Sequence, residues 1–176
     1  FDPIHVGHVV AASDARAALE LDRVLLVVAG DPWQKRGQVV ASGAERLELV
    51  DAAVADVEGV EASAIEVERD GASVTADTLE ALARPGRGLW LLLGADAVAN
   101  MGTWRRIDET RHLATIVVIE REGEHAVPPG PGWRVEHLSI PRLDVSSTDV
   151  RARLARGHPA DGLVPAASLR IIRDRG

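Results

Sequence analysis

Apolar runs alternate along this chain with segments whose apolar residues recur at helical spacing. Because a strand covered on both faces is apolar throughout, runs such as LWLLL and ATIVVI indicate buried strands. The predicted strands span residues 23–29, 60–67, 89–93, 114–119 and 134–138. The predicted helices span residues 7–21, 44–54, 74–83, 95–101, 104–113, 148–156 and 165–172. This alternation predicts the α/β class, with a doubly wound parallel sheet and flanking helices.

The length of 176 residues suits one domain, and the chain has no internal repeat or interdomain linker. We therefore expect a single domain over residues 1–176. The chain opens with Phe1-Asp2-Pro3, which is typical of a loop, whereas a doubly wound fold usually begins with a strand. We expect the first strand of the fold to lie upstream of Phe1.

Composition narrows the classes of function. The chain lacks cysteine, which excludes disulfides, thiolate chemistry and cysteine-based zinc sites. It shows no apolar run long enough to span a bilayer and no signal peptide, so we expect a cytoplasmic protein without a membrane partner. The net charge of −7 disfavours nucleic-acid binding. Cations for a phosphate ligand must therefore gather locally, and Lys35 is the one lysine among 20 basic residues.

The string His5-Val6-Gly7-His8 is the first candidate for chemistry. If a helix begins near Gly7, His5 and His8 share its first turn, where outward-pointing N–H groups favour anions. Gly7 permits close approach of the main chain to a ligand. The pattern predicts a phosphate clamp, and the alternative is a pair of surface or helix-capping histidines.

A second candidate lies near the other end, in Ser146-Ser147-Thr148-Asp149-Val150-Arg151. Ser146 or Ser147 can cap the following helix, and Ser147, Thr148 and Arg151 would then converge on a phosphate chain. The alternative is an ordinary capped helix.

The third candidate is Gly94-Ala95-Asp96, which follows the LWLLL strand. Ligands of such sheets bind at the carboxyl ends of the strands, so Asp96 is a candidate for orienting a ribose, or else caps the next helix. Trp104 follows in a polar setting, which favours a binding role over a place in the core.

FDPIHVGH resembles the signature of the nucleotidyltransferase superfamily with the HxGH motif. GADAVANMGTWRRIDE and GASVTADTL are similar to blocks of its nicotinate mononucleotide adenylyltransferase family, with Val74 where tyrosine is common. The resemblance covers nearly the whole chain and implies a Rossmann-like sheet. It implies that His5, His8 and Lys35 are catalytic. The ATP and phosphate contacts that it implies are Phe1, Gly7, Arg46, Gly94, Asp96, Arg121, Ser147, Thr148 and Arg151. It also implies that Trp104 stacks on the pyridine ring, while the Thr75 turn and Arg105 hold the nicotinate carboxylate.

The implied reaction transfers AMP from ATP to nicotinate mononucleotide, with Mg²⁺ held by phosphate oxygens and water and by no protein metal site. A phosphopantetheine adenylyltransferase is the nearest alternative, because it also carries HxGH. A non-catalytic nucleotide-binding module is another, although His5, His8 and Lys35 are all present. The sequence leaves open whether the chain forms a homo-oligomer.

Overall fold

The computed structural model describes residues 1–35, 37, 39–120, 127–128 and 130–175. Its internal contacts divide the chain into two compact units. Unit 1 comprises Phe1–Ser73 and Leu143–Gly176, and unit 2 comprises Val74–Arg142. Unit 2 is thus one continuous segment, whereas unit 1 is built from two. The single nucleotidyltransferase domain over residues 1–176 stays a prediction.

Unit 1 contains two parallel strands, β1 (Val24–Val27) and β2 (Val60–Ser63), paired from Val24 with Val60 to Val27 with Ser63. Helix α1 packs on β1, and α2 packs on β2 and on α7. The helices of unit 1 are α1 (Val6–Ala18), the short 3-10 helix η1 (Trp33–Lys35), α2 (Gly43–Val54), α6 (Ser147–Ala155) and α7 (Ala166–Asp174).

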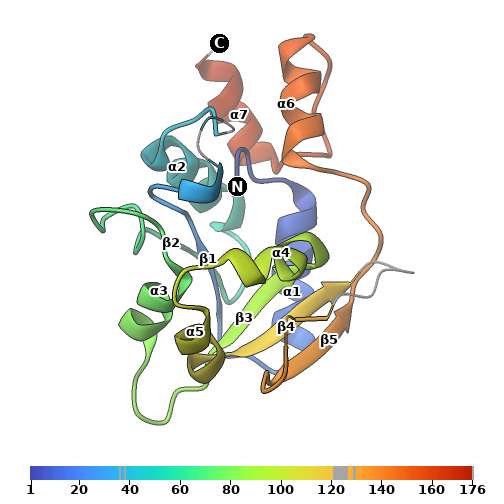
Figure 1. The fold of residues 1–176 in the computed structure, drawn as a ribbon. Coiled ribbons are helices and arrows are strands. Elements are labelled where there is room, and N and C mark those ends of the chain that lie inside the picture. Colours follow the sequence, from blue (N-terminus) through green and yellow to red (C-terminus); the bar gives the residue numbers. More distant parts are fainter. Residues whose placement is uncertain (36, 38, 121–126, 129, 176) are drawn as a thin grey trace. The chain divides into compact units, whose positions relative to one another are not determined.

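Unit 2 contains three parallel strands in the order β3-β4-β5, which lie side by side in Figure 1. They are β3 (Trp90–Gly94), β4 (Thr115–Glu120) and β5 (Val135–Ser139). The helices of unit 2 are α3 (Thr75–Leu82), α4 (Ala95–Asn100), the 3-10 helix η2 (Met101–Thr103) and α5 (Ile107–Leu113). Helix α4 packs on β3 and β4, and α3 packs on α5.

The α/β class, the parallel pairing and the flanking helices are confirmed, and every predicted strand and helix is present within a few residues. The two 3-10 helices were not predicted. The described strands form two parallel sheets, β1-β2 and β3-β4-β5. In these sheets β1 pairs with β2 and β3 pairs with β4, and no described strand joins the two.

Each unit has its own apolar cluster. In unit 1, Val6 at the start of α1 packs against a buried cluster from the C-terminal part of the chain, Val145, Val150, Ala160, Val164 and Leu169. In unit 2, the buried cluster joins α4 and η2 to β4 and consists of Val98, Met101, Ile116 and Val118. Within the described residues, none of the helices has the length and apolar character needed to cross a membrane.

Replacing Gly30 with alanine should destabilise unit 1. A Cβ at this position would lie 2.1 Å from the main-chain oxygen of Glu66, and main chain cannot move aside as a flexible side chain can. We expect Gly30→Ala to lower the free energy of unfolding by about 1–3 kcal/mol, measured by urea denaturation. Gly43→Ala is the matched control, because its nearest neighbour would be 3.6 Å away. Equal stability of the two variants would contradict this account.

Candidate active site

The two histidines of the first motif meet at the start of α1. His5 precedes the helix with an extended backbone, and His8 lies in its first turn. Their rings stack with centroids 3.6 Å apart and planes 26° from parallel. The His5 N–H donates a hydrogen bond of 3.2 Å to Nδ1 of His8. Because Nδ1 accepts, a neutral His8 carries its proton on Nε2, and that N–H is a donor suited to a phosphate oxygen.

The space around these rings explains the glycine between them. A Cβ on Gly7 would lie 3.1 Å from Nδ1 of His5 and 3.3 Å from Cγ1 of Val145, so one of these groups would have to shift. Phe1 packs edge-on against His8, with ring centroids 4.8 Å apart. Phe1, Gly7 and the two histidines therefore form one packed group.

The second motif forms the start of α6. Ser146 caps this helix by accepting a hydrogen bond of 3.1 Å from the Asp149 N–H, so the capping residue is Ser146 and not Ser147. The Ser147 hydroxyl donates instead to the main-chain oxygen of Pro3, at 2.9 Å. The structure thus brings the second motif against the segment that leads into the first.

Arg151 makes a second link of the same kind. Its guanidinium donates to the main-chain oxygen of Asp2 at 2.6 Å and to the Thr148 hydroxyl at 3.4 Å. Four of the predicted phosphate residues, Gly7, Ser147, Thr148 and Arg151, are therefore connected through the Asp2-Pro3 segment that leads into α1.

Asp2 is a residue of this site that sequence reasoning missed. Its carboxylate accepts hydrogen bonds from the N–H groups of Val40, at 2.9 Å, and Ala41, at 3.3 Å. The same carboxylate lies 3.7 Å from the guanidinium of Arg151. The one available signal in the sequence was an acidic residue next to a motif suited to binding anions. Such a residue indicates that a basic partner lies nearby.

Arg46 is buried, with only 3% of its surface exposed. Its guanidinium donates to the main-chain oxygens of Ala29, at 2.7 Å, and Ala41, at 3.2 Å. Burial lowers the pKa of Arg46, and the nearby Asp2 carboxylate opposes that change. The observed contacts of Arg46 are thus with the loop after β1 and the segment before α2, and its contact with phosphate stays a prediction.

Lys35 and Arg121 are two other predicted basic residues of the site. Lys35 ends the short helix η1 in the loop that follows β1. Arg121 lies outside the described residues.

In unit 2, Gly94 ends β3 and Asp96 lies exposed in the first turn of α4. This is the carboxyl end of a parallel strand, as the sequence predicted. Thr75 is the first residue of α3, and Val74 precedes it with no side-chain capping bond. Neither Ser73 nor Thr75 is therefore the capping residue of this helix.

Trp104 and Arg105 follow η2. Trp104 is half-buried and packs against the apolar cluster of unit 2, so it has a part in the core that the sequence argument had ranked second. Arg105 is exposed. Stacking of Trp104 on a pyridine ring stays a prediction.

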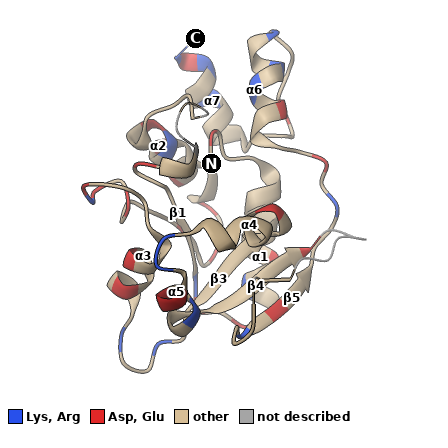
Figure 2. Cartoon of the chain, in the orientation of Figure 1, with Lys and Arg blue, Asp and Glu red and all other residues tan. Residues whose placement is uncertain are grey.

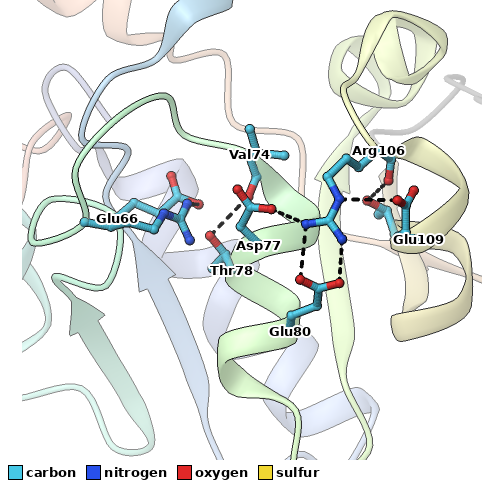
Figure 3. A network of polar contacts seen from close by, with 9 residues as sticks. Glu66, Val74, Asp77, Thr78, Glu80, Arg106 and Glu109 are labelled. Carbon is cyan, nitrogen blue, oxygen red and sulfur yellow. Dashed lines mark hydrogen bonds and ion pairs between the residues drawn. The ribbon is translucent and has the colours of Figure 1, made fainter.

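Arg106 is the centre of a polar network that sequence reasoning also missed (Figure 3). Its guanidinium contacts Glu80 at 2.6 and 3.1 Å, Glu109 at 3.3 Å, and Asp77. The hydrogen bonds that Arg106 donates to Glu80, Asp77 and Glu109 raise the pKa of Arg106, in that order of importance. Figure 2 shows the acidic residues of this network on α3 and α5. The acidic pair Asp77 and Glu80, at helical spacing on α3, was the available signal.

The described site residues fall into two groups. Unit 1 holds Phe1, His5, Gly7, His8, Lys35, Arg46, Ser147, Thr148 and Arg151. Unit 2 holds Thr75, Gly94, Asp96, Trp104 and Arg105. In the part of the chain that the structure describes, no three His, Asp or Glu side chains lie close enough together to hold a metal ion.

Comparisons with known proteins show the family of this chain. A family model described as "Cytidylyltransferase-like" matches residues 1–153. A protein of Streptomyces coelicolor named "Probable nicotinate-nucleotide adenylyltransferase" is 39% identical over 178 residues, which covers 99% of this chain and 95% of the relative. A protein of Frankia casuarinae with the same name is 41% identical over 179 residues, covering 99% of this chain and 94% of the relative.

Among solved structures, "Plasmodium falciparum nicotinic acid mononucleotide adenylyltransferase complexed with NaAD" matches with a TM-score of 0.80. The match covers 99% of this chain and 91% of that chain, and at 14% identity it shows the fold alone. The chain belongs to the cytidylyltransferase-like family and, within it, to the nicotinate-nucleotide adenylyltransferases, which confirms the family expected from the sequence.

Asp2→Ala should destabilise unit 1. The substitution removes the acceptor for two main-chain N–H groups and a carboxylate that faces Arg151. Because hydrogen bonds to charged groups contribute about 1.5–3 kcal/mol each, we expect a loss of at least about 1.5 kcal/mol in the free energy of unfolding. Asp2→Asn keeps one acceptor oxygen and should lose less. The exposed Asp56, changed to Asn, is the control, and an Asp2→Ala variant as stable as Asp56→Asn would refute the role of Asp2.

Proposed function

We propose that this chain transfers AMP from ATP to nicotinate mononucleotide, giving deamido-NAD and pyrophosphate in the biosynthesis of NAD. The observation that carries the proposal is the link between the two phosphate motifs: Ser147 and Arg151 bind the Asp2-Pro3 segment that leads into the histidine motif. Membership of the nicotinate-nucleotide adenylyltransferases supports the choice of acceptor. It favours this acceptor over phosphopantetheine, and an enzyme over a non-catalytic binding module.

In the proposed reaction, a phosphate oxygen of nicotinate mononucleotide attacks the α-phosphorus of ATP. A new P–O bond forms as the bond to the pyrophosphate oxygen breaks, and the bond's electron pair leaves with pyrophosphate. No nucleophilic side chain is needed, because such transfers depend on positioning and on neutralising charge. The Nε2–H of His8, fixed by the hydrogen bond that Nδ1 accepts, donates to an oxygen that gains charge in the transition state.

In this proposal, three basic residues of unit 1 stabilise the negative charge of the triphosphate. Lys35 and Arg151 supply positive charge, with Arg46 adding to the local potential, and Thr148 and the N–H groups at the start of α1 supply hydrogen bonds. His5 shares this role, and Phe1 fixes the ring of His8. Mg²⁺ enters bound to ATP as part of the substrate and neutralises phosphate charge, with water as its other ligands. Gly94, Asp96 and Arg121 are assigned to the nucleotide as well.

The acceptor is assigned to unit 2. Trp104 stacks on the pyridine ring, and donors of the Thr75 turn and of Arg105 bind the carboxylate of nicotinate. A cytoplasmic location stays a prediction.

The acceptor is tested by measuring pyrophosphate release with ATP and each of nicotinate mononucleotide, nicotinamide mononucleotide and phosphopantetheine. The nicotinate and nicotinamide rings have nearly the same shape, so shape alone cannot distinguish them. We expect hydrogen-bond donors directed at the carboxylate of nicotinate to make the distinction. Charge-assisted hydrogen bonds of about 1.5–3 kcal/mol predict a kcat/KM about tenfold or more higher for the acid. Trp104→Ala should weaken the binding of both pyridine acceptors, because stacking on the ring does not depend on whether the ring carries a carboxylate or an amide. Equal efficiency for acid and amide in the wild type would rule out the proposed substrate.

His8→Ala should abolish most turnover while ATP still binds. A donor that acts in the transition state lowers kcat when it is removed, by about 10²–10³-fold. Single-turnover kinetics would measure kcat, and calorimetry would measure the affinity for ATP. His158 is exposed in the same unit, and His158→Ala should retain wild-type kcat. Near-normal kcat in His8→Ala would remove the basis for the catalytic assignment.

A further inference from the structure

Arg106 joins two segments of unit 2 that are far apart in the sequence. Its guanidinium binds Asp77 and Glu80 on α3, while its own main chain continues from Trp104 and Arg105 into α5 (Figure 3). The main-chain oxygen of Arg106 accepts a hydrogen bond of 3.2 Å from the hydroxyl of Thr110, which is fully buried. The side chain and the main chain of Arg106 are therefore both held in place.

A contribution to folding stability does not explain an arginine at position 106. Arg106 has φ +56° and ψ +39°, a left-handed conformation in which glycine is favoured and a side chain is disfavoured. Its side chain is 39% exposed, and ion pairs at that exposure contribute little to folding. A strained backbone that carries weakly stabilising ion pairs indicates that the guanidinium has another purpose.

The charges around Arg106 suggest that purpose. Asp77 lies in the first turn of α3, the turn that begins with Thr75. A carboxylate in that position is attracted to the N–H groups at the helix start, where it would compete with an anionic ligand. Arg106 binds Asp77 and also faces Glu80 and Glu109, so it offsets part of a strongly negative environment.

We propose that Arg106 is a positioning residue that fixes Asp77 in the first turn of α3 and offsets the charge of the nearby carboxylates, which makes this site accept an anionic acceptor ring. This inference rests on the proposed function, because it explains how unit 2 prefers the acid over the amide. Arg106 itself needs no contact with the substrate. It acts by fixing Asp77 and by offsetting the charge of three carboxylates.

The test compares kcat/KM for nicotinate mononucleotide and nicotinamide mononucleotide in the wild type, Arg106→Gln, Arg106→Lys and Arg106→Gly. We expect Arg106→Gln to reduce the acid-to-amide ratio about fivefold or more, through a higher KM for the acid with little change in the KM for ATP. Arg106→Lys keeps the charge and should keep most of the ratio. Adding Asp77→Asn and Glu80→Gln to Arg106→Gln should restore the acid-to-amide ratio of kcat/KM. These substitutions remove two carboxylates whose charge Arg106 no longer offsets.

Two controls separate this role from a structural one. Glycine adopts the backbone angles of Arg106 without strain, so Arg106→Gly should fold and still lose the preference for the acid. Arg84 is exposed just beyond the C-terminal end of α3 and donates to main-chain oxygens of Ala81 and Ala83, so Arg84→Gln should keep the ratio.

The outcomes distinguish a failure of the inference about Arg106 from a failure of the proposed function on which it rests. If the wild type shows no turnover, or no preference for the acid, the proposed function fails and the inference fails with it. If the wild type prefers the acid but Arg106→Gln and Arg106→Gly keep its ratio, only the inference is overturned. An equal loss of efficiency with both acceptors, at a constant ratio, would likewise overturn it and leave Arg106 a merely structural residue.

Discussion

The hydrogen bonds that Ser147 and Arg151 donate to the main-chain oxygens of Pro3 and Asp2 are the constraint on which unit 1 depends. They join residues that are 144 and 149 positions apart in the sequence. The segment they hold leads directly into α1, so they also define where His5 and His8 lie. Val6 adds an apolar anchor to the same arrangement by packing on the C-terminal cluster. The position of the histidine pair is thus determined by α6 and α7 as much as by α1.

The arginines of this acidic chain are mostly engaged by its own oxygen atoms. Arg46 binds main-chain oxygens, Arg151 binds the main chain of Asp2, and Arg106 binds three carboxylates. Such contacts limit the motion of a long side chain and lower the entropy that it loses when a ligand binds. They also show how a chain of net charge −7 keeps individual cations in fixed positions.

Local patterns in the sequence predicted the strands and helices, because each depends on neighbours a few residues away. The pairing partners of each strand could not be predicted in the same way, since pairing is a contact between distant segments. The same distinction applies to the candidate site. The HxGH string is recognised from its spacing, and the packing around Gly7 agrees with it. Asp2 and Arg106 were missed because their partners lie up to 149 and 29 positions away, which leaves no periodic signal.

Unit 2 is inserted within unit 1, between Ser73 and Leu143, and this order has a consequence for biosynthesis. A chain that emerges from the ribosome in sequence order completes Val74–Arg142 before the residues that close unit 1 have been made. Unit 2 can then fold during translation from contacts within one continuous segment. Unit 1 must wait for α6 and α7, and until they emerge the start of α1 lacks both its apolar cover and the donors that hold it.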